Sequence, residues 1–138
     1  MVLDTNVPVS AVLSGRGAPA TILRAWQDDR FQLLTSVPLL DELEQVLARP
    51  QIAERLGWSA TERLAFLFAL GESAILVHPG LPLQVVEMDP SDDRVLEAAL
   101  EANADYIVSG DRHLLDLGSY GTIPVVTPAH FVAALAID

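Results

Sequence analysis

The chain has 138 residues, of which 51% are hydrophobic and 20% are charged, so a single globular domain over residues 1–138 is expected rather than a disordered segment. The absence of cysteine excludes disulfides, thiolate zinc sites and cysteine nucleophiles, and it suits a reducing cytoplasm. No apolar run reaches the roughly 20 residues that span a bilayer, and no signal-peptide pattern is visible. We therefore expect a cytoplasmic protein without a membrane contact.

The formal net charge is −11, and all eight basic residues are arginine. An acidic chain binds nucleic acid poorly unless bound metal and a few placed arginines overcome the repulsion from phosphates. The same charge would attract a basic partner protein. Because lysine is missing, a phosphate-handling site that requires a lysine ammonium group is excluded.

Short apolar runs alternate with segments of helical pattern along the chain. The apolar runs predict strands at residues 1–3, 31–35, 74–77, 106–109 and 124–126. The helical patterns predict helices near residues 7–13, from 19, over 36–48, from 59 to about 71, over 93–100, over 112–117 and from 127. A proline-rich loop is expected over residues 79–90. This alternation predicts a parallel sheet covered by helices on both faces, with functional residues beyond the carboxyl ends of its strands.

Four acidic residues stand at these element boundaries: Asp4, Glu42, Asp93 and Asp111. Carboxylates at strand ends and helix starts can converge on one crevice, where they would repel one another unless a hard cation neutralises them. Asp4 directly follows a buried strand, and Thr5 and Asn6 are placed to orient it. The alternative is that Asp4 or Asn6 caps the following helix. We favour a metal ligand at Asp4.

The other three acidic positions leave alternatives open. In the helix over 36–48, Glu42 and Glu44 flank the apolar stripe on opposite sides, and periodicity does not choose between them. Asp92 and Asp93 can both face inward, and either can cap the following helix. Asp111 can equally well cap the short helix that follows it. Asp41 points away from the stripe and is expected to be solvated.

Taken together and in order, these motifs resemble the PIN-domain nucleases, in particular the toxin components of bacterial toxin–antitoxin systems of the VapC type. The resemblance covers the whole chain. The motifs that carry it are residues 4–7, 42–43, 92–99, 105–115 and 123–131. The resemblance implies an α/β fold, a three-layer αβα sandwich around a mainly parallel sheet of about five strands. The first strand is shorter than is usual in that family, which would fit a native start further upstream.

The resemblance further implies a metal-dependent endoribonuclease that hydrolyses RNA with one or two Mg²⁺ or Mn²⁺ ions. It selects Asp4, Glu42, Asp93 and Asp111 as metal ligands and catalytic residues. The residues expected to support them are Thr5, Asn6, Asp92 and Ser109. Arg16, Arg94 and Arg112 adjoin the site motifs and are candidates for binding flanking phosphates. The implied partners are an antitoxin protein and further copies of the chain in a homodimer or higher oligomer.

Two other functions fit some of the same residues. A phosphoacceptor or phosphatase-like domain also gathers acids at strand ends, but such sites normally use a lysine, which this chain lacks. A non-catalytic interaction module is the other alternative, and the four acidic residues argue against it. Separately, residues 51–70 are apolar around much of the helix circumference, which predicts a protein-binding surface unless Phe66 and Phe68 both pack in the core.

Overall fold

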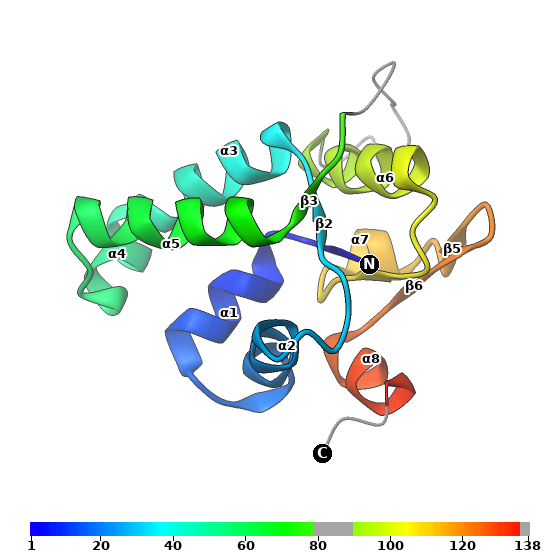
Figure 1. The fold of residues 1–138 in the computed structure, drawn as a ribbon, viewed down its shortest axis with the longest axis horizontal. Helices are drawn as coiled ribbons and strands as arrows, with labels where there is room; N and C mark the ends of the chain where they lie inside the picture. Colours follow the sequence, from blue (N-terminus) through cyan, green and yellow to red (C-terminus); the bar gives the residue numbers. More distant parts are fainter. Residues whose placement is uncertain (79–89, 136–138) are drawn as a thin grey trace.

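The computed structural model describes residues 1–78 and 90–135, with side chains from Asp93 onward in the second range. Within these residues six strands form one sheet in the order β3-β2-β1-β4-β6-β5. The strands are β1 (Val2–Leu3), β2 (Leu34–Thr35), β3 (Ile75–Leu76), β4 (Ile107–Val108), β5 (Ser119–Tyr120) and β6 (Ile123–Val126). The helices are α1 (Asn6–Ser14), α2 (Gly17–Gln27), α3 (Val37–Leu47), α4 (Pro50–Leu56), α5 (Ala60–Ser73), α6 (Pro90–Ala102), α7 (Arg112–Leu115) and α8 (Pro128–Ala134) (Figure 1).

The sheet is parallel apart from its last strand. β1 lies between β2 and β4, with Val2 aligned to Leu34 on one side and to Ile107 on the other. β2 also pairs with β3, and β4 pairs with β6, all in parallel. The predicted mainly parallel sheet is therefore confirmed, and β1, which carries Asp4 at its end, occupies a central position.

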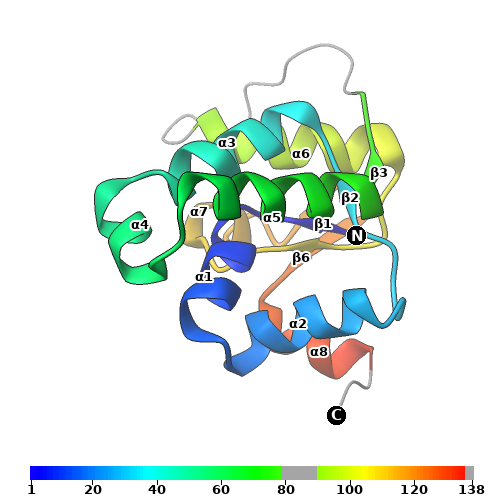
Figure 2. The same ribbon diagram turned by 60° about the vertical axis from the view of Figure 1, so that its left-hand side comes forward.

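Side chains alternate between the two faces of the sheet, as the pleat requires. Val2 and Ile107 pack into a cluster with apolar residues of α6 and α7, while Leu3 and Val108 pack into a second cluster with residues of α1, α2 and α8. In Figure 2 the sheet lies between α6 on one side and α2 with α8 on the other. This arrangement is the predicted three-layer αβα sandwich.

Local signals explain where several helices begin. The hydroxyl of Ser36 accepts a hydrogen bond from the backbone N–H of Leu39 at 3.3 Å and caps α3. Ser59 and Glu62 form a capping box at the start of α5, because each side chain accepts from the other residue's backbone N–H. These caps satisfy N–H groups that have no partner within the helix.

The structure corrects the sequence prediction in two places. Instead of about five strands, the described residues form six, because β5 pairs antiparallel with β6 through a tight turn at Gly121 (φ +62°). No helix was predicted between residues 48 and 59, where the structure has α4 with Pro50 as its first residue. Proline suits that position because its missing N–H would be unpaired in the first turn in any case. The prediction of a loop over residues 79–90 lies outside the described residues except at position 90.

Candidate active site

Asp4 stands directly beyond the carboxyl end of the central strand β1, and Ser109 stands in the same place beyond β4. The two strands remain hydrogen-bonded there, since the backbone N–H of Asp4 donates to the carbonyl of Val108 at 2.9 Å. Both side chains are buried, with Asp4 only 5% exposed. A carboxylate in such a position is costly unless polar groups surround it.

Ser109 links two of the acidic residues. Its hydroxyl donates to Oδ2 of Asp4 at 2.5 Å, and the same oxygen accepts from the backbone N–H of Asp111 at 2.8 Å. The side-chain oxygen of Asn6 accepts from the backbone N–H of Gly110 at 3.4 Å and adds a second connection between α1 and the loop after β4. The structure therefore brings together four of the predicted residues, Asp4, Asn6, Ser109 and Asp111.

The start of α1 bears on whether Asp4 is a helix cap. The N-cap residue is Thr5, and its side chain makes no capping hydrogen bond. Thr5 is buried, whereas Asn6 is exposed. Asp4 directs Oδ2 to Ser109 across the sheet, so the capping alternative does not describe its observed hydrogen bond.

Asp111, in contrast, does cap a helix. Its Oδ1 accepts from the backbone N–H of His113 at 2.7 Å at the start of α7, and Nδ1 of His113 lies 3.5 Å from the same oxygen. The side chain of Asp111 is half-buried. Capping employs one carboxylate oxygen, which leaves the role of Asp111 as a metal ligand a prediction.

The acidic side chains of α3 differ in how far they are exposed to solvent. Leu39 and Leu43 are buried on the inner face of the helix, whereas Asp41 and Glu44 are exposed. Glu42 is half-buried, and its Oε2 atom is shielded from solvent. Of the two glutamates that periodicity could not separate, Glu42 is thus the one placed against the protein interior. Its catalytic role remains a prediction.

Helix α6 runs from the carboxyl edge of the sheet toward the amino edge. Its end is followed by Asn103 and Ala104, which line a cavity together with the strand starts Leu34 and Ile75. At 1.5 Å per residue its 13 residues span about 20 Å. The start of α6, with Asp93, therefore lies toward the edge where Asp4 is found. Asp93 is 3% exposed, and α6 contacts β1, β2, β4 and α3.

Glu97, which is not among the predicted site residues, is also buried at 7% exposure. Glu97 follows Asp93 by four residues, so both acids share one face of α6. Its carboxylate accepts two hydrogen bonds from the guanidinium of Arg94, one from Nε at 3.0 Å and one from Nη2. The four-residue spacing was the available signal, since it places Glu97 beside Asp93 rather than on the solvent side.

The three predicted phosphate-binding arginines differ in how firmly they are held. Arg16 and Arg112 are exposed, while Arg94 is 31% exposed and tied to Glu97. The prediction for Asp92 falls on a side chain outside the described residues.

Within the described residues, no three His, Asp or Glu side chains stand close enough together to form a ready-made metal site. The donor chemistry nevertheless fits a hard divalent cation, because Asp4, Glu42 and Asp93 offer shielded carboxylate oxygens.

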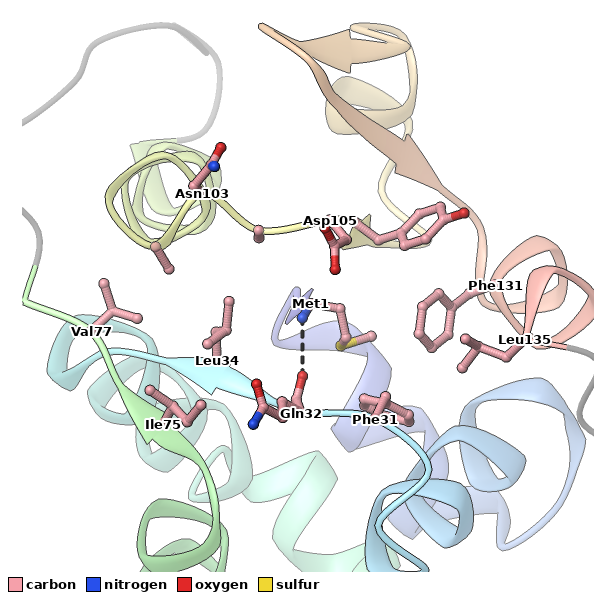
Figure 3. Close-up of a pocket in the computed structure, with 13 residues that line it drawn as sticks. Met1, Phe31, Gln32, Leu34, Ile75, Val77, Asn103, Asp105, Phe131 and Leu135 are labelled. Atoms are coloured by element: carbon pink, nitrogen blue, oxygen red, sulfur yellow. Dashed lines mark hydrogen bonds between the residues drawn. The ribbon is translucent and has the colours of Figure 1, made fainter.

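A cavity of about 640 Å³ lies at the opposite, amino edge of the sheet (Figure 3). Its lining is mainly apolar and includes Phe31, Tyr106 and Phe131, whose rings pack edge to face. The Met1 amino group there donates to the carbonyl of Gln32 at 3.0 Å, and burial lowers its pKa while nearby Asp105 acts in the opposite direction. This cavity is separate from the carboxylates at the carboxyl edge.

A three-layer α/β fold with buried carboxylates beyond its central strands defines the class of protein to which this chain belongs. Residues 1–113 match the PIN domain family, and the chain belongs to that family, which confirms the resemblance predicted from the motifs. PIN domains are nucleases that generally use divalent metal ions. Membership therefore supports hydrolysis of nucleic acid as the general activity.

The chain is also similar to Uncharacterized protein MJ1680 of Methanocaldococcus jannaschii. The two are 28% identical over 117 residues, which cover 85% of this chain and 74% of the archaeal protein. In the part of the chain that the structure describes, no helix is both long enough and apolar enough to cross a membrane.

Proposed function

We propose that this chain is a metal-dependent endoribonuclease that hydrolyses phosphodiester bonds of RNA and acts as the toxin of a toxin–antitoxin pair. The observation that carries the proposal is the buried connection from Asp4 through the Ser109 hydroxyl to the backbone of Asp111. A buried carboxylate held by a buried hydroxyl at the end of a central strand is a rigid ligand position. Membership of the PIN domain family supports the nuclease part of the proposal.

Asp4, Glu42, Asp93 and Asp111 would hold one or two Mg²⁺ or Mn²⁺ ions. Bound at this edge, such ions would neutralise the scissile phosphate and make a water molecule a better nucleophile. The residues of the chain have two further tasks. Ser109 and Asn6 would fix the loop after β4 relative to α1, so that Asp4 and Asp111 keep their spacing. Arg16, Arg94 and Arg112 would hold flanking phosphates.

The absence of lysine favours RNA hydrolysis over a phosphoacceptor or phosphatase-like function. Without lysine, no side-chain ammonium group can neutralise a transferred phosphoryl group, as phosphoacceptor sites normally require. Few cations also imply weak affinity for nucleic acid in general, so accessible single strands are the expected targets. A basic antitoxin would suit a partner of net charge −11.

A cleavage assay on fluorescent single-stranded RNA tests the proposal. Cleavage should require Mg²⁺ or Mn²⁺, stop in excess EDTA and return when metal is restored. Asp4→Asn should abolish it, while the matched change Asp41→Asn, at an exposed position of α3, should not. Cleavage that persists in excess EDTA would rule out metal dependence. Absence of cleavage by the well-folded wild type with either metal would favour a non-catalytic interaction module.

The toxin role has a separate test. Expression of the wild-type chain in a bacterial host should arrest growth, and the Asp4→Asn variant should not. Co-expression of a small basic protein encoded beside it should restore growth and should yield a complex that copurifies with the chain. A chain that cleaves RNA but leaves growth unaffected would keep the nuclease proposal and remove the toxin role.

A further inference from the structure

A partly buried ion pair between Arg94 and Glu97 lies in the middle of α6, and its arginine directly follows Asp93. The guanidinium of Arg94 donates through Nε and Nη2 to the two carboxylate oxygens of Glu97, which is the two-point geometry that arginine forms with carboxylates. Glu97 is only 7% exposed, whereas 31% of the Arg94 side chain reaches solvent. The pair therefore has a buried acidic partner and a partly exposed basic partner.

This arrangement restricts where the positive charge can be. A free arginine side chain samples many rotamers, and ordering it costs conformational free energy. Because two hydrogen bonds to a buried carboxylate order the Arg94 side chain when the protein folds, this free energy is not lost again when a ligand binds. The planar guanidinium then has a fixed orientation relative to α6, and a ligand can reach the exposed part of the side chain without further ordering.

The ion pair lies on the helix whose start points to the predicted active site. Asp93 and Glu97 lie on one face of the helix, and the start of α6 points to the carboxyl edge of the sheet where Asp4 and Ser109 are joined. Arg16 and Arg112 are exposed at other element starts, and no hydrogen bond to a carboxylate is described for either. Arg94 is thus the one of these three whose observed geometry holds it in position.

We propose that Glu97 is a positioning residue: its buried carboxylate holds the Arg94 guanidinium beside Asp93, where Arg94 contacts a phosphate of the RNA next to the scissile bond. This inference rests on the proposed ribonuclease function. It assigns Glu97 no contact with RNA or metal. Its effect on the reaction passes through Arg94 alone.

The experiment is a double-mutant cycle on cleavage of single-stranded RNA, measured over a series of potassium chloride concentrations. The variants are Arg94→Gln, Glu97→Gln and the two combined. Glu101→Gln, one turn further along α6 and exposed, is the matched control for the glutamate. Arg55→Gln, exposed at the end of α4, is the matched control for the arginine. Thermal unfolding of each variant is recorded in parallel.

Arg94→Gln should raise KM about tenfold, the loss expected for one charge-assisted contact, and should change kcat little. The slope of log(kcat/KM) against log salt should become shallower by about 0.7, the value for one phosphate contact on a single strand. Glu97→Gln should shift KM in the same direction. In the Arg94→Gln background, Glu97→Gln should have no further effect on KM. The two controls should leave KM and the salt slope unchanged.

Three results would overturn the proposal. A salt slope unaltered in Arg94→Gln would show that Arg94 contacts no phosphate. A further rise in KM on adding Glu97→Gln to Arg94→Gln would show that Glu97 acts independently of Arg94. A fall in melting temperature and in kcat without a change in KM or slope would reduce the pair to a structural role. If the wild type itself cleaves no RNA, the proposed function fails and this inference fails with it.

Discussion

The Ser109 hydroxyl donates to Oδ2 of Asp4 at 2.5 Å and thereby connects two residues that are 105 positions apart in the sequence. Ser109 is fully buried, and its oxygen also accepts from the backbone N–H of Asp111. One side chain therefore serves as donor to one acidic residue and as acceptor to the backbone of another. Its removal would leave a buried carboxylate oxygen and a backbone N–H without this partner.

Ser109→Ala should for that reason destabilise the protein and impair cleavage. A buried polar group that loses its hydrogen bond costs about 1–3 kcal/mol, and more when the group is charged. We expect a lower free energy of unfolding in urea and a clear loss of kcat. Ser10→Ala, at an exposed position of α1, is the control and should change neither. An unfolding curve of Ser109→Ala that coincides with wild type would show that the bond contributes nothing to stability.

Asp4→Asn should separate stability from metal binding. Carboxylates that share a metal ion repel one another when the ion is absent, so removal of one such charge should leave the melting temperature of the metal-free protein unchanged or raise it. Metal at 100 times its Kd should stabilise the wild type by about 2.7 kcal/mol. The variant should gain much less. The measurement is thermal unfolding with and without Mg²⁺ or Mn²⁺, and equal stabilisation of both proteins would remove Asp4 from the metal ligands.

The Asp93→Asn variant tests whether Asp93 is a metal ligand or instead stabilises the start of α6. Asp93 is 3% exposed in the first turns of α6, where an acid can also stabilise the helix through its dipole. If it serves chiefly as a ligand, the metal-free variant should melt no lower than wild type and should cleave no RNA. A large fall in its melting temperature without metal would instead assign the residue to helix stabilisation. Asp41→Asn on α3 is the control for both measurements.

Much of the fold could be predicted because its strands and helix starts carry local signals. Val2 and Leu3 form an apolar run too short for a helix, and Ser59 with Glu62 marks a helix start by hydrogen bonds within four residues. The strand β5 carried no such signal. Its two residues are held by antiparallel pairing with β6, which depends on how the chain turns at Gly121 rather than on their own propensity.

The sequence predicted only part of the candidate site. Asp4 directly follows an apolar run, and in a parallel sheet that places it beyond the carboxyl end of a strand. The sequence could not decide between capping and function at Asp111, because the same carboxylate can do both, and the structure shows that it caps α7. Glu97 was missed although it follows Asp93 by four residues, because that spacing alone does not reveal that its side chain is buried.

The outer surface of α5 gives the last prediction. Phe66 packs against the core and against Trp58, with ring centroids 5.5 Å apart, whereas Phe68 is 70% exposed. The alternative that both phenylalanines pack in the core is therefore wrong for Phe68. Leu64, one turn earlier, is also exposed, and two large apolar side chains on one helix face favour an interface.

Phe68→Glu should keep the fold, because the side chain that it replaces is mostly in solvent, and it should weaken self-association. The free energy of unfolding should change by no more than about 0.5 kcal/mol relative to wild type measured as a monomer. Size-exclusion chromatography with light scattering over a range of protein concentrations gives the oligomeric state. Ala69→Glu adds the same charge at the neighbouring exposed position and serves as the control. A wild-type chain that is monomeric throughout, or a Phe68→Glu variant with the same oligomeric state as wild type, would show that this helix face is not where copies of the chain meet.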